Sequence, residues 1–523
     1  MPPYLWLLLV VLLGSGYVRT VPLDNEANSH SRLDWTDTKN PNSAPNRHVA
    51  VHLFEWKWMD IAAECERFLG PMGYSGVQVS PPNEHVVLDE NPWYQRYQPV
   101  SYKLISRSGT EEQFIDMVNR CNAVGVRIYV DAVINHMSYA SGKSSGGSSF
   151  FPANLSFPGV PYSALDFSDH LCNSGSGGIE NYDDIYQVRN CRLVGLPDLW
   201  LSKEWVTQKI VDYLNHLLDL GVAGFRIDAA KHMWPEDINK IIRMLKNLRE
   251  DIYGPNHRPF IYFEVIDMGG GSIRANHYSW MGRVSEFLYG KKLSDVVSKN
   301  DGQKLKYLRN FGSDWGLLPD GDAQIMIDNH DNQRGHGGGG SYLTFFEFRK
   351  YKIASTFMLS WPYGYPVIMS SYRFDRNNDG QGPPSNDRGE TNDVPILEDG
   401  SCGGGWVCEH RWRQIANFVQ LRNVAWGYPV ENWWDNGDNQ IAFSRGDKAF
   451  VAINNDDYSP LDQWLQTGLP AGEYCDIVSG SLINGRCTGK QVTVHQDGKA
   501  LIQIGNLEQD PIIGLHINAR LSA

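Results

Sequence analysis

The sequence predicts an α/β protein built on a (β/α)8 TIM barrel, with a loop-rich subdomain inserted after strand three and a C-terminal all-β, Greek-key-like domain. Three observations lead to this fold class. Strand-like and helix-like segments alternate between residues 48 and 372. The strand-like segments are nearly continuous apolar runs, which are typical of a parallel sheet covered on both faces. Residues 434–523 instead show short strands separated by turns.

Eight strand-like segments justify the barrel. Most are followed by a helical pattern with apolar residues three and four positions apart, as in residues 111–125 and 203–221. A glycine closes both of these helices, and residues 59–69 show the same periodicity. The strands are predicted, in chain order, at residues 48–56, 73–82, 127–136, 224–230, 259–266, 284–290, 324–331 and 365–372.

One long insert and one terminal region depart from this alternation of strands and helices. Residues 137–199 are rich in Gly, Ser, Asn and Asp and show no convincing helix, so we expect a functional loop region or a small subdomain. This insert divides the catalytic barrel into residues 48–136 and 200–433. In the terminal domain, 434–523, strands are predicted at residues 442–446, 449–455, 493–505 and 511–517.

The N-terminus carries a targeting pattern. Residues 4–13 form an apolar run that is too short to span a bilayer, and small residues follow it at positions 14–16. Residues 1–20 are therefore interpreted as a signal peptide of a secreted, extracellular protein. The polar residues 21–47 are predicted to be a poorly ordered lead-in. No later apolar run is long enough for a membrane span, so no membrane partner is expected.

Composition narrows the class of protein. The chain has 523 residues, of which 41% are hydrophobic and 20% charged, as in ordinary globular proteins. Its net charge of −13 makes it a poor candidate for binding nucleic acid or an anionic membrane. The 25 Tyr and 17 Trp residues include enough aromatic surface for sugar-stacking platforms. We expect a monomer.

Eight cysteines suit a disulfide-bonded secreted protein. The sequence alone does not choose among the many possible pairings. Short separations favour Cys402–Cys408, Cys475–Cys487 and Cys172–Cys191, which leaves Cys65 with Cys121. Residues 154–156 read Asn-Leu-Ser, a sequon for N-glycosylation.

Charged residues gather where the predicted strands end. In a (β/α)8 barrel these ends form the active-site mouth. Asp228, Glu264 and Asp331 lie at the ends of the fourth, fifth and seventh predicted strands. Glycoside hydrolysis requires at least two carboxyl groups, one to protonate the leaving oxygen and one to act as nucleophile or base. A purely structural ring of ion pairs is the alternative, and three carboxylates at one mouth favour the hydrolytic interpretation.

Several motifs carry a family resemblance. They are HLFEWKW (52–58), DAVINH (131–136), GFRIDAAKH (224–232), FEVID (263–267) and DNHDNQRGHG (328–337). Together they resemble animal-type α-amylases of glycoside hydrolase family thirteen, and the resemblance runs from about residue 48 to the end of the chain. It implies a retaining attack on internal α-1,4 bonds of starch and glycogen.

The resemblance assigns chemical roles to five residues. It implies that Asp228 is the nucleophile, that Glu264 is the general acid and then the base, and that Asp331 stabilises the transition state. His136 and His330 would hydrogen-bond the sugar at the cleavage site. A lone histidine is more often structural, but these two flank the carboxylates in sequence.

A sugar-binding loop is implied at NPWYQRYQP (91–99). Trp93, Tyr94 and Tyr97 match stacking platforms there, and Gln98 matches a polar contact. Tyr94 stands where relatives usually have Trp, and plain packing of the aromatic side chains is the alternative. Lys231 lies just past its strand, on the side expected to face the ligand.

The resemblance also implies one calcium ion that holds residues 137–199 against the barrel. The matching positions are Asn135, Arg189, Asp198 and His232. Calcium prefers oxygen ligands, so Arg189 and His232 would contribute backbone carbonyls while the other two contribute side-chain oxygens.

An anion site is doubtful in this chain. Animal-type relatives bind chloride through two arginines and an asparagine. Arg226 and Asn329 match two of these positions, but Val367 stands where the second arginine is expected. A fifth disulfide of the relatives is also missing, because Ser138 occupies the position of one of its cysteines.

The sequence leaves other functions open. An α-glucosidase or a transglycosylase could use the same fold and the same carboxyl groups. A non-catalytic, amylase-like binding subunit is the alternative outside enzymes. That alternative predicts a missing acid or nucleophile and a membrane anchor, whereas both Asp228 and Glu264 are present.

Overall fold

The computed structural model describes residues 37–337 and 342–522. The predicted signal peptide and the first part of the lead-in lie outside these residues. Among the helices described, none combines the length and the apolar character that crossing a membrane requires.

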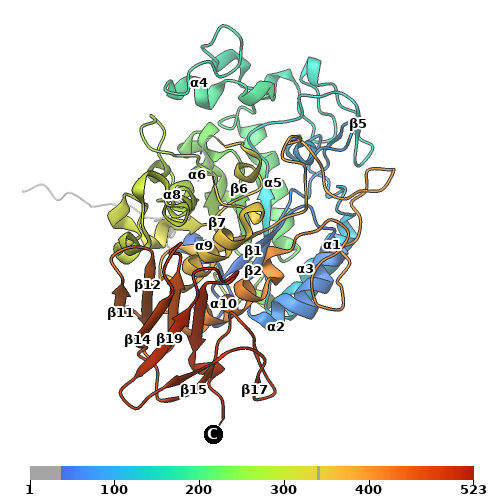
Figure 1. Ribbon diagram of the computed structural model, residues 1–523. Coiled ribbons are helices and arrows are strands. Elements are labelled where there is room, and N and C mark those ends of the chain that lie inside the picture. Colours follow the sequence, from blue (N-terminus) through green and yellow to red (C-terminus); the bar gives the residue numbers. More distant parts are fainter. Residues whose placement is uncertain (1–36, 338–341, 523) are drawn as a thin grey trace, which may run out of the picture. The chain divides into compact units, whose positions relative to one another are not determined.

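Eight parallel strands close into a barrel in the order β1-β10-β9-β8-β7-β6-β4-β2, which confirms the predicted fold. Figure 1 shows four of these strands, β1, β2, β6 and β7, among the helices. Each strand is almost fully buried, because the interior of the barrel covers one face and helices cover the other. The strands are β1 (Ala50–Leu53), β2 (Gly76–Val79), β4 (Arg127–Ala132), β6 (Gly224–Ile227), β7 (Phe260–Phe263), β8 (Arg283–Ser285), β9 (Ala323–Ile325) and β10 (Tyr365–Ser370).

The barrel strands are shorter than the apolar runs that predict them. The predicted strand 284–290 illustrates the reason, because β8 ends at Ser285 and helix α8 begins at Phe287. The side chain of Glu286 accepts a hydrogen bond from the backbone N–H of Leu288 at 3.2 Å, which caps the helix. Apolar residues after this cap are buried on a helix rather than on a strand.

The predicted helices are present. In α3 the side chains of Thr110 and Gln113 form a reciprocal capping box. Gly125 and Gly221 have φ of 74° and 101°, so each supplies the left-handed turn after its helix. The helices outside the insert are α1 (Trp58–Glu64, continued by a π-turn at Cys65–Leu69), α2 (Gly70–Met72), α3 (Glu111–Ala123), α5 (Glu204–Asp219), α6 (Pro235–Met244), α7 (Glu250–Tyr253), α8 (Phe287–Ser298), α9 (Phe348–Ser360) and α10 (Arg413–Val424).

The insert contains a short helix that the sequence did not predict. Helix α4 (Ile185–Asn190) begins after Asp184, whose side chain accepts from the N–H groups of Tyr186 and Gln187. The expectation of no helix is wrong here, because six residues are too few to show helical periodicity. A two-stranded sheet of β3 (Val86–Val87) and β5 (Lys143–Ser144) also ties the insert to the loop after β2.

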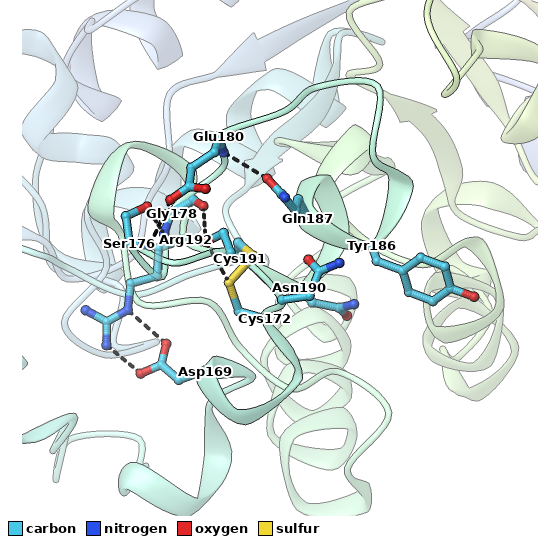
Figure 2. The surroundings of a disulfide bond; sticks show 12 residues. Asp169, Cys172, Ser176, Gly178, Glu180, Tyr186, Gln187, Asn190, Cys191 and Arg192 are labelled. Carbon is cyan, nitrogen blue, oxygen red and sulfur yellow. Dashed lines mark hydrogen bonds and ion pairs between the residues drawn. A yellow bond between two sulfur atoms is a disulfide. The ribbon is translucent and has the colours of Figure 1, made fainter.

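The disulfide Cys172–Cys191 braces α4 (Figure 2). Around it, the Arg192 guanidinium pairs with Asp169, and the Gln187 side chain accepts from the N–H of Glu180. The other favoured pairs, Cys65–Cys121, Cys402–Cys408 and Cys475–Cys487, are present as well. The pairing preferred on sequence separation is therefore confirmed.

The C-terminal region is all β. Its four-stranded sheet has the order β11-β12-β13-β20, and two strand pairs, β14–β19 and β15–β18, lie beside it. The sequence missed the strands β11, β14, β15, β16 and β17. In β14, three consecutive exposed residues hide the alternation. The strands are β11 (Val430–Asp435), β12 (Gln440–Arg445), β13 (Ala449–Asn454), β14 (Leu461–Gln466), β15 (Gly472–Cys475), β16 (Leu482–Ile483), β17 (Arg486–Cys487), β18 (Gln491–Val494), β19 (Lys499–Ile504) and β20 (Ile512–His516).

Residues 37–47 are packed, so the expectation of poor order is wrong for this part of the lead-in. Asn42 donates to the carbonyl of Arg258 at 2.9 Å, and its own carbonyl accepts from Arg127 Nε at 2.9 Å. The Tyr129 hydroxyl donates to the carbonyl of Pro41 at 2.6 Å. The polar composition that suggested disorder instead satisfies groups at the N-terminal ends of the barrel strands.

Candidate active site

One arginine organises the carboxylates at the barrel mouth. Arg226 of β6 places Nη1 at 2.5 Å from Asp131 Oδ1 and 2.9 Å from Asp228 Oδ1. Its Nη2 lies 2.7 Å from Glu264 Oε1, an ion pair that lacks good hydrogen-bond alignment. All four side chains are buried. Because isolated buried charges are strongly destabilising, this shared guanidinium explains how charged residues can occupy a strand of the barrel.

Burial and the negative charge of neighbouring carboxylates raise the pKa of two carboxyl groups at the mouth, although the single cation among them opposes the shift. Burial raises the pKa of Asp228 well above its usual range, although Arg226 opposes the shift. Burial and the charge of Glu264 together raise the pKa of Asp331 to about 7. Carboxyl groups whose pKa values are strongly perturbed by burial and by each other are common at sites of acid–base chemistry.

The turn after β6 links two of the predicted site residues. Ala229 has φ of 49°, a left-handed conformation that is uncommon for residues other than glycine. This turn directs the N–H of Ala229 at Glu264 Oε2, at 2.9 Å. The strained residue directly after Asp228 thus donates a hydrogen bond to the neighbouring carboxyl, and such strain is common at functional sites.

The turn after β9 presents His330 and Asp331. The Asn329 side chain accepts from the N–H of Asp331 at 3.0 Å, and the Asn332 side chain accepts from the N–H of Asn329 at 2.8 Å. His330 Nε2 lies 3.7 Å from Asp331 Oδ2. The His330 ring stacks on Tyr97 with centroids 5.0 Å apart, so the two predicted contact residues support each other.

An open cleft of about 880 Å³ contains every predicted catalytic and substrate-binding residue. Its apolar and aromatic lining with a few convergent polar groups is typical of ligand sites. The predicted residues in its lining are Trp93, Tyr94, Tyr97, Gln98, His136, Asp228, Lys231, Glu264, His330 and Asp331.

The aromatic residues predicted to contact the substrate differ in how exposed their side chains are. Tyr94 is 42% exposed, whereas Trp93 is 6% exposed and is held by a hydrogen bond from its indole N–H to the carbonyl of Asp379. The Tyr97 hydroxyl donates to Asp131 Oδ2 at 2.8 Å. Tyr94 thus offers the most open aromatic surface of this loop.

The polar contact residues are also partly engaged. Gln98 Oε1 accepts from the N–H groups of Tyr139 and Ala140 at 3.2 Å, so its oxygen shapes the adjoining loop. Lys231 Nζ donates to the carbonyl of Ile266 at 2.8 Å. Burial lowers the pKa of His136 to about 4, which keeps this imidazole neutral.

Sequence reasoning missed much of the cleft lining. Several missed residues come from the insert, where Gly- and Ser-rich composition concealed isolated aromatic and branched side chains. The signal available in the sequence was the presence of aromatic and branched apolar residues in an otherwise polar loop. The missed lining residues include Tyr139, Tyr182, Leu193, Val194, Leu196, Ile266, Asp267, Met268, Ile273, His336 and Asp379.

A second, smaller cavity of about 70 Å³ is lined by all four predicted calcium positions. Asn135 Oδ1 is buried there without a hydrogen-bond partner in the protein. Asp198 accepts from the Ser168 hydroxyl, and burial raises the pKa of its carboxyl well above the usual range. A buried carboxylate beside an unpartnered amide oxygen fits a hard cation.

The other two calcium positions have engaged side chains. Arg189 Nη2 donates to the Tyr278 hydroxyl at 3.0 Å, and its guanidinium lies over the Trp234 ring. His232 Nδ1 lies 3.0 Å from the carbonyl of Val188. Their backbone carbonyls are thus the groups suited to an ion, in line with the sequence interpretation.

A third cavity, of about 20 Å³, lies beside Glu264. Arg226, Asn329 and Val367 line it, so the residues predicted for an anion do come together. Val367 presents only methyl groups, and burial lowers the pKa of the adjoining His52 well below its usual range. Among the described lining residues, the cation is Arg226, which already pairs with three carboxylates.

Comparisons with known proteins agree with this architecture. Residues 432–518 match the family described as alpha amylase, C-terminal all-beta domain. The chain is 56% identical to an alpha-amylase of Oryzias latipes, over 92% of this chain and 97% of the relative. It is 55% identical to pancreatic alpha-amylase 2a5 of Mus musculus, over 92% of this chain and 96% of the relative.

Solved structures give the same result. The complex of maltohexaose with a mutant of alpha-amylase I from Eisenia fetida has a TM-score of 0.88 and 48% identity, covering 91% of this chain and 98% of that chain. A gamma-CGTase from Alkalophilic bacillus clarkii, at 19% identity and a TM-score of 0.61, shares the fold and covers 91% of this chain and 71% of that chain.

A parallel barrel with three acidic side chains at its mouth and an all-β C-terminal domain defines this protein as a glycoside hydrolase. More specifically, the chain belongs to the animal-type α-amylases, because these relatives match it over nearly its whole length.

Proposed function

We propose that this α-amylase is secreted and hydrolyses internal α-1,4 bonds of starch- and glycogen-type polysaccharides with retention of configuration. The carrying observation is that a single guanidinium contacts both Asp228 and Glu264. Retaining enzymes need their two carboxyl groups close together, about 5–5.5 Å apart, and a shared arginine supports such a spacing.

In the first step, Glu264 donates its proton to the glycosidic oxygen while a carboxylate oxygen of Asp228 bonds to the anomeric carbon. The bond to the leaving sugar breaks, and that sugar departs as an alcohol. In the second step, Glu264 removes a proton from water, whose oxygen attacks the anomeric carbon and releases Asp228. Asp331 stabilises the positive charge that develops on the sugar ring.

The substrate is held by stacking and by hydrogen bonds to its hydroxyl groups. Tyr94 supplies the most exposed aromatic face, and Trp93 and Tyr97 line the cleft beside it. His136 and His330 are neutral in this environment, because burial lowers the pKa of both. A neutral imidazole can both donate to and accept from sugar hydroxyls.

Calcium is proposed as a structural ion. Asn135 and Asp198 would hold it through side-chain oxygens, and Arg189 and His232 through backbone carbonyls. When bound, the ion supplies positive charge that keeps Asp198 ionised and fastens the insert to the barrel. His232 lies four residues after Asp228 in the sequence, so ordering of the ion site also orders the loop beside the mouth.

Secretion is supported by the apolar N-terminal segment and by four disulfides. Disulfides form and persist in oxidising compartments. We further propose that the enzyme acts as a monomer and does not depend on chloride.

The test of this function is the cleavage pattern on amylose. An enzyme that attacks internal bonds lowers viscosity before much reducing sugar accumulates, and it hydrolyses a maltoheptaoside blocked at its non-reducing end. Release of glucose from chain ends at constant viscosity would indicate an α-glucosidase. Formation of longer or cyclic glucans would indicate a transglycosylase, and no product would favour a binding subunit.

A further inference from the structure

An exposed tyrosine in the insert lies on the wall of the catalytic cleft. Tyr139 lines the cleft and is 62% exposed, the largest exposed fraction among the aromatic residues there. Exposing an aromatic side chain to this extent gains nothing for folding, because the hydrophobic effect favours its burial. An exposed aromatic face in a sugar-binding cleft is suited to stacking.

The backbone of Tyr139 is fixed to the predicted sugar-binding loop. Its N–H donates to Gln98 Oε1 at 3.2 Å, and the Ser138 hydroxyl contacts the same oxygen at 3.3 Å. Gln98 follows Tyr97 directly, and the Tyr97 ring stacks on His330. The side chain of Gln98 therefore links the backbone of Tyr139 to the segment that carries Tyr97.

The Tyr139 ring is held on its other side by the far end of the insert. The N–H of Met137 donates to the carbonyl of Pro197 at 3.0 Å, which sets two segments of the insert side by side. Tyr139 comes two residues after Met137, and Gly195 comes two residues before Pro197. The Tyr139 ring lies beside Gly195, 3.6 Å from the position that a Cβ there would occupy. A Cβ at position 195 would therefore make ordinary van der Waals contact with the ring. One edge of the ring thus lies beside Gly195, and Tyr139 also lines the cleft.

We propose that Tyr139 is a specificity-determining residue that stacks on a glucosyl unit of long substrates, beyond the units held by Trp93 and Tyr94. The inference rests on the proposed function and adds one further binding position to the same cleft. It predicts that the enzyme favours chains long enough to reach Tyr139, while short oligosaccharides gain nothing from this residue.

The experiment compares kcat/KM for maltotriose and maltoheptaose in the wild type and in Tyr139→Ala. We expect the value for maltoheptaose to fall by about two- to tenfold, through a higher KM, while the value for maltotriose changes by less than about twofold. Tyr139→Phe retains the ring and should behave as the wild type. The positions of cleavage in maltoheptaose should also shift in Tyr139→Ala.

Tyr186 supplies a matched control. It lies in the same insert and is also 62% exposed, but it packs near Trp234 and is absent from the described lining of the cleft. Figure 2 shows its side chain directed away from the disulfide. Tyr186→Ala should leave kcat/KM unchanged for both substrates. A loss in this variant would instead reveal a general effect of removing an exposed tyrosine from the insert.

The outcomes are distinct. An equal loss on both substrates, or no loss on maltoheptaose, would overturn the role of Tyr139 while the wild-type activity stands. A wild type that hydrolyses neither substrate would overturn the proposed function and this inference together. A selective loss with the long substrate, reversed by Phe, supports the inference.

Discussion

Removing chloride from the assay buffer is expected to change the rate of the wild-type enzyme by less than about twofold, because the cavity beside Glu264 lacks a free cation among its described lining residues. Val367 supplies only methyl groups there, and His52 is neutral. Arg226 is already surrounded by Asp131, Asp228 and Glu264, so an added anion would face three carboxyl groups.

The magnitude follows from the missing contact. A charge-assisted hydrogen bond contributes about 1.5–3 kcal/mol, so replacing an arginine by valine weakens anion binding by about 10- to 150-fold. The cavity of about 20 Å³ holds little more than one water molecule, which further limits a hydrated ion.

The assay is hydrolysis of soluble starch after dialysis into chloride-free buffer, followed by titration with sodium chloride at constant ionic strength. Val367→Arg, which adds the missing cation, should create a saturable response to chloride, whereas Val367→Met, of similar length without charge, should not. A several-fold saturable activation of the wild type at low millimolar chloride would refute this reasoning.

Three other predictions follow from the same site. Glu264→Gln should lower kcat by about 10²–10⁴-fold and Asp228→Asn at least as much, with Tm within about 4 °C of the wild type; near-normal turnover would contradict their roles. Exhaustive chelation should lower Tm, speed hydrogen exchange in residues 137–199 and abolish activity until calcium is restored, and unchanged melting would count against the ion site. Folding raises the pKa of Asp331 to about 7. Its contribution to stability is therefore fully present below the pKa that it has in the unfolded chain, and is lost as pH rises through about 7. Asp331→Asn should therefore raise Tm more at pH 8 than at pH 4, modestly because 22% of the side chain stays exposed, and an equal change at both pH values would exclude this titration.

The barrel was predictable because its strands are buried on both faces. Runs such as residues 127–136 contain few polar positions, and each ends at a residue that the mouth uses. In β14, by contrast, Asp462, Gln463 and Trp464 are all exposed, so the sequence lacks the alternation by which a strand is recognised. Local pattern predicts elements whose burial is regular and misses those whose burial depends on distant partners.

The same limit applies to the site. Asp228 and Glu264 follow strong strand patterns, so their meeting at one mouth follows from the topology of a parallel barrel. Tyr139 lies in the cleft with its backbone N–H donating to Gln98 and its ring beside Gly195. These contacts join segments that are about 40 and 56 residues away in the chain. No pattern within residues 137–199 indicates them.

The Cys172–Cys191 disulfide has a consequence for the proposed calcium site. Ser168, which donates to Asp198, lies four residues before the first cysteine, and Arg189 lies two residues before the second. The covalent bond therefore joins the segments that carry both walls of the cavity proposed for calcium, and preorganised ligands bind more tightly because less freedom is lost on binding. We expect a chain reduced at this disulfide to bind calcium more weakly, because its oxygen ligands are then less preorganised.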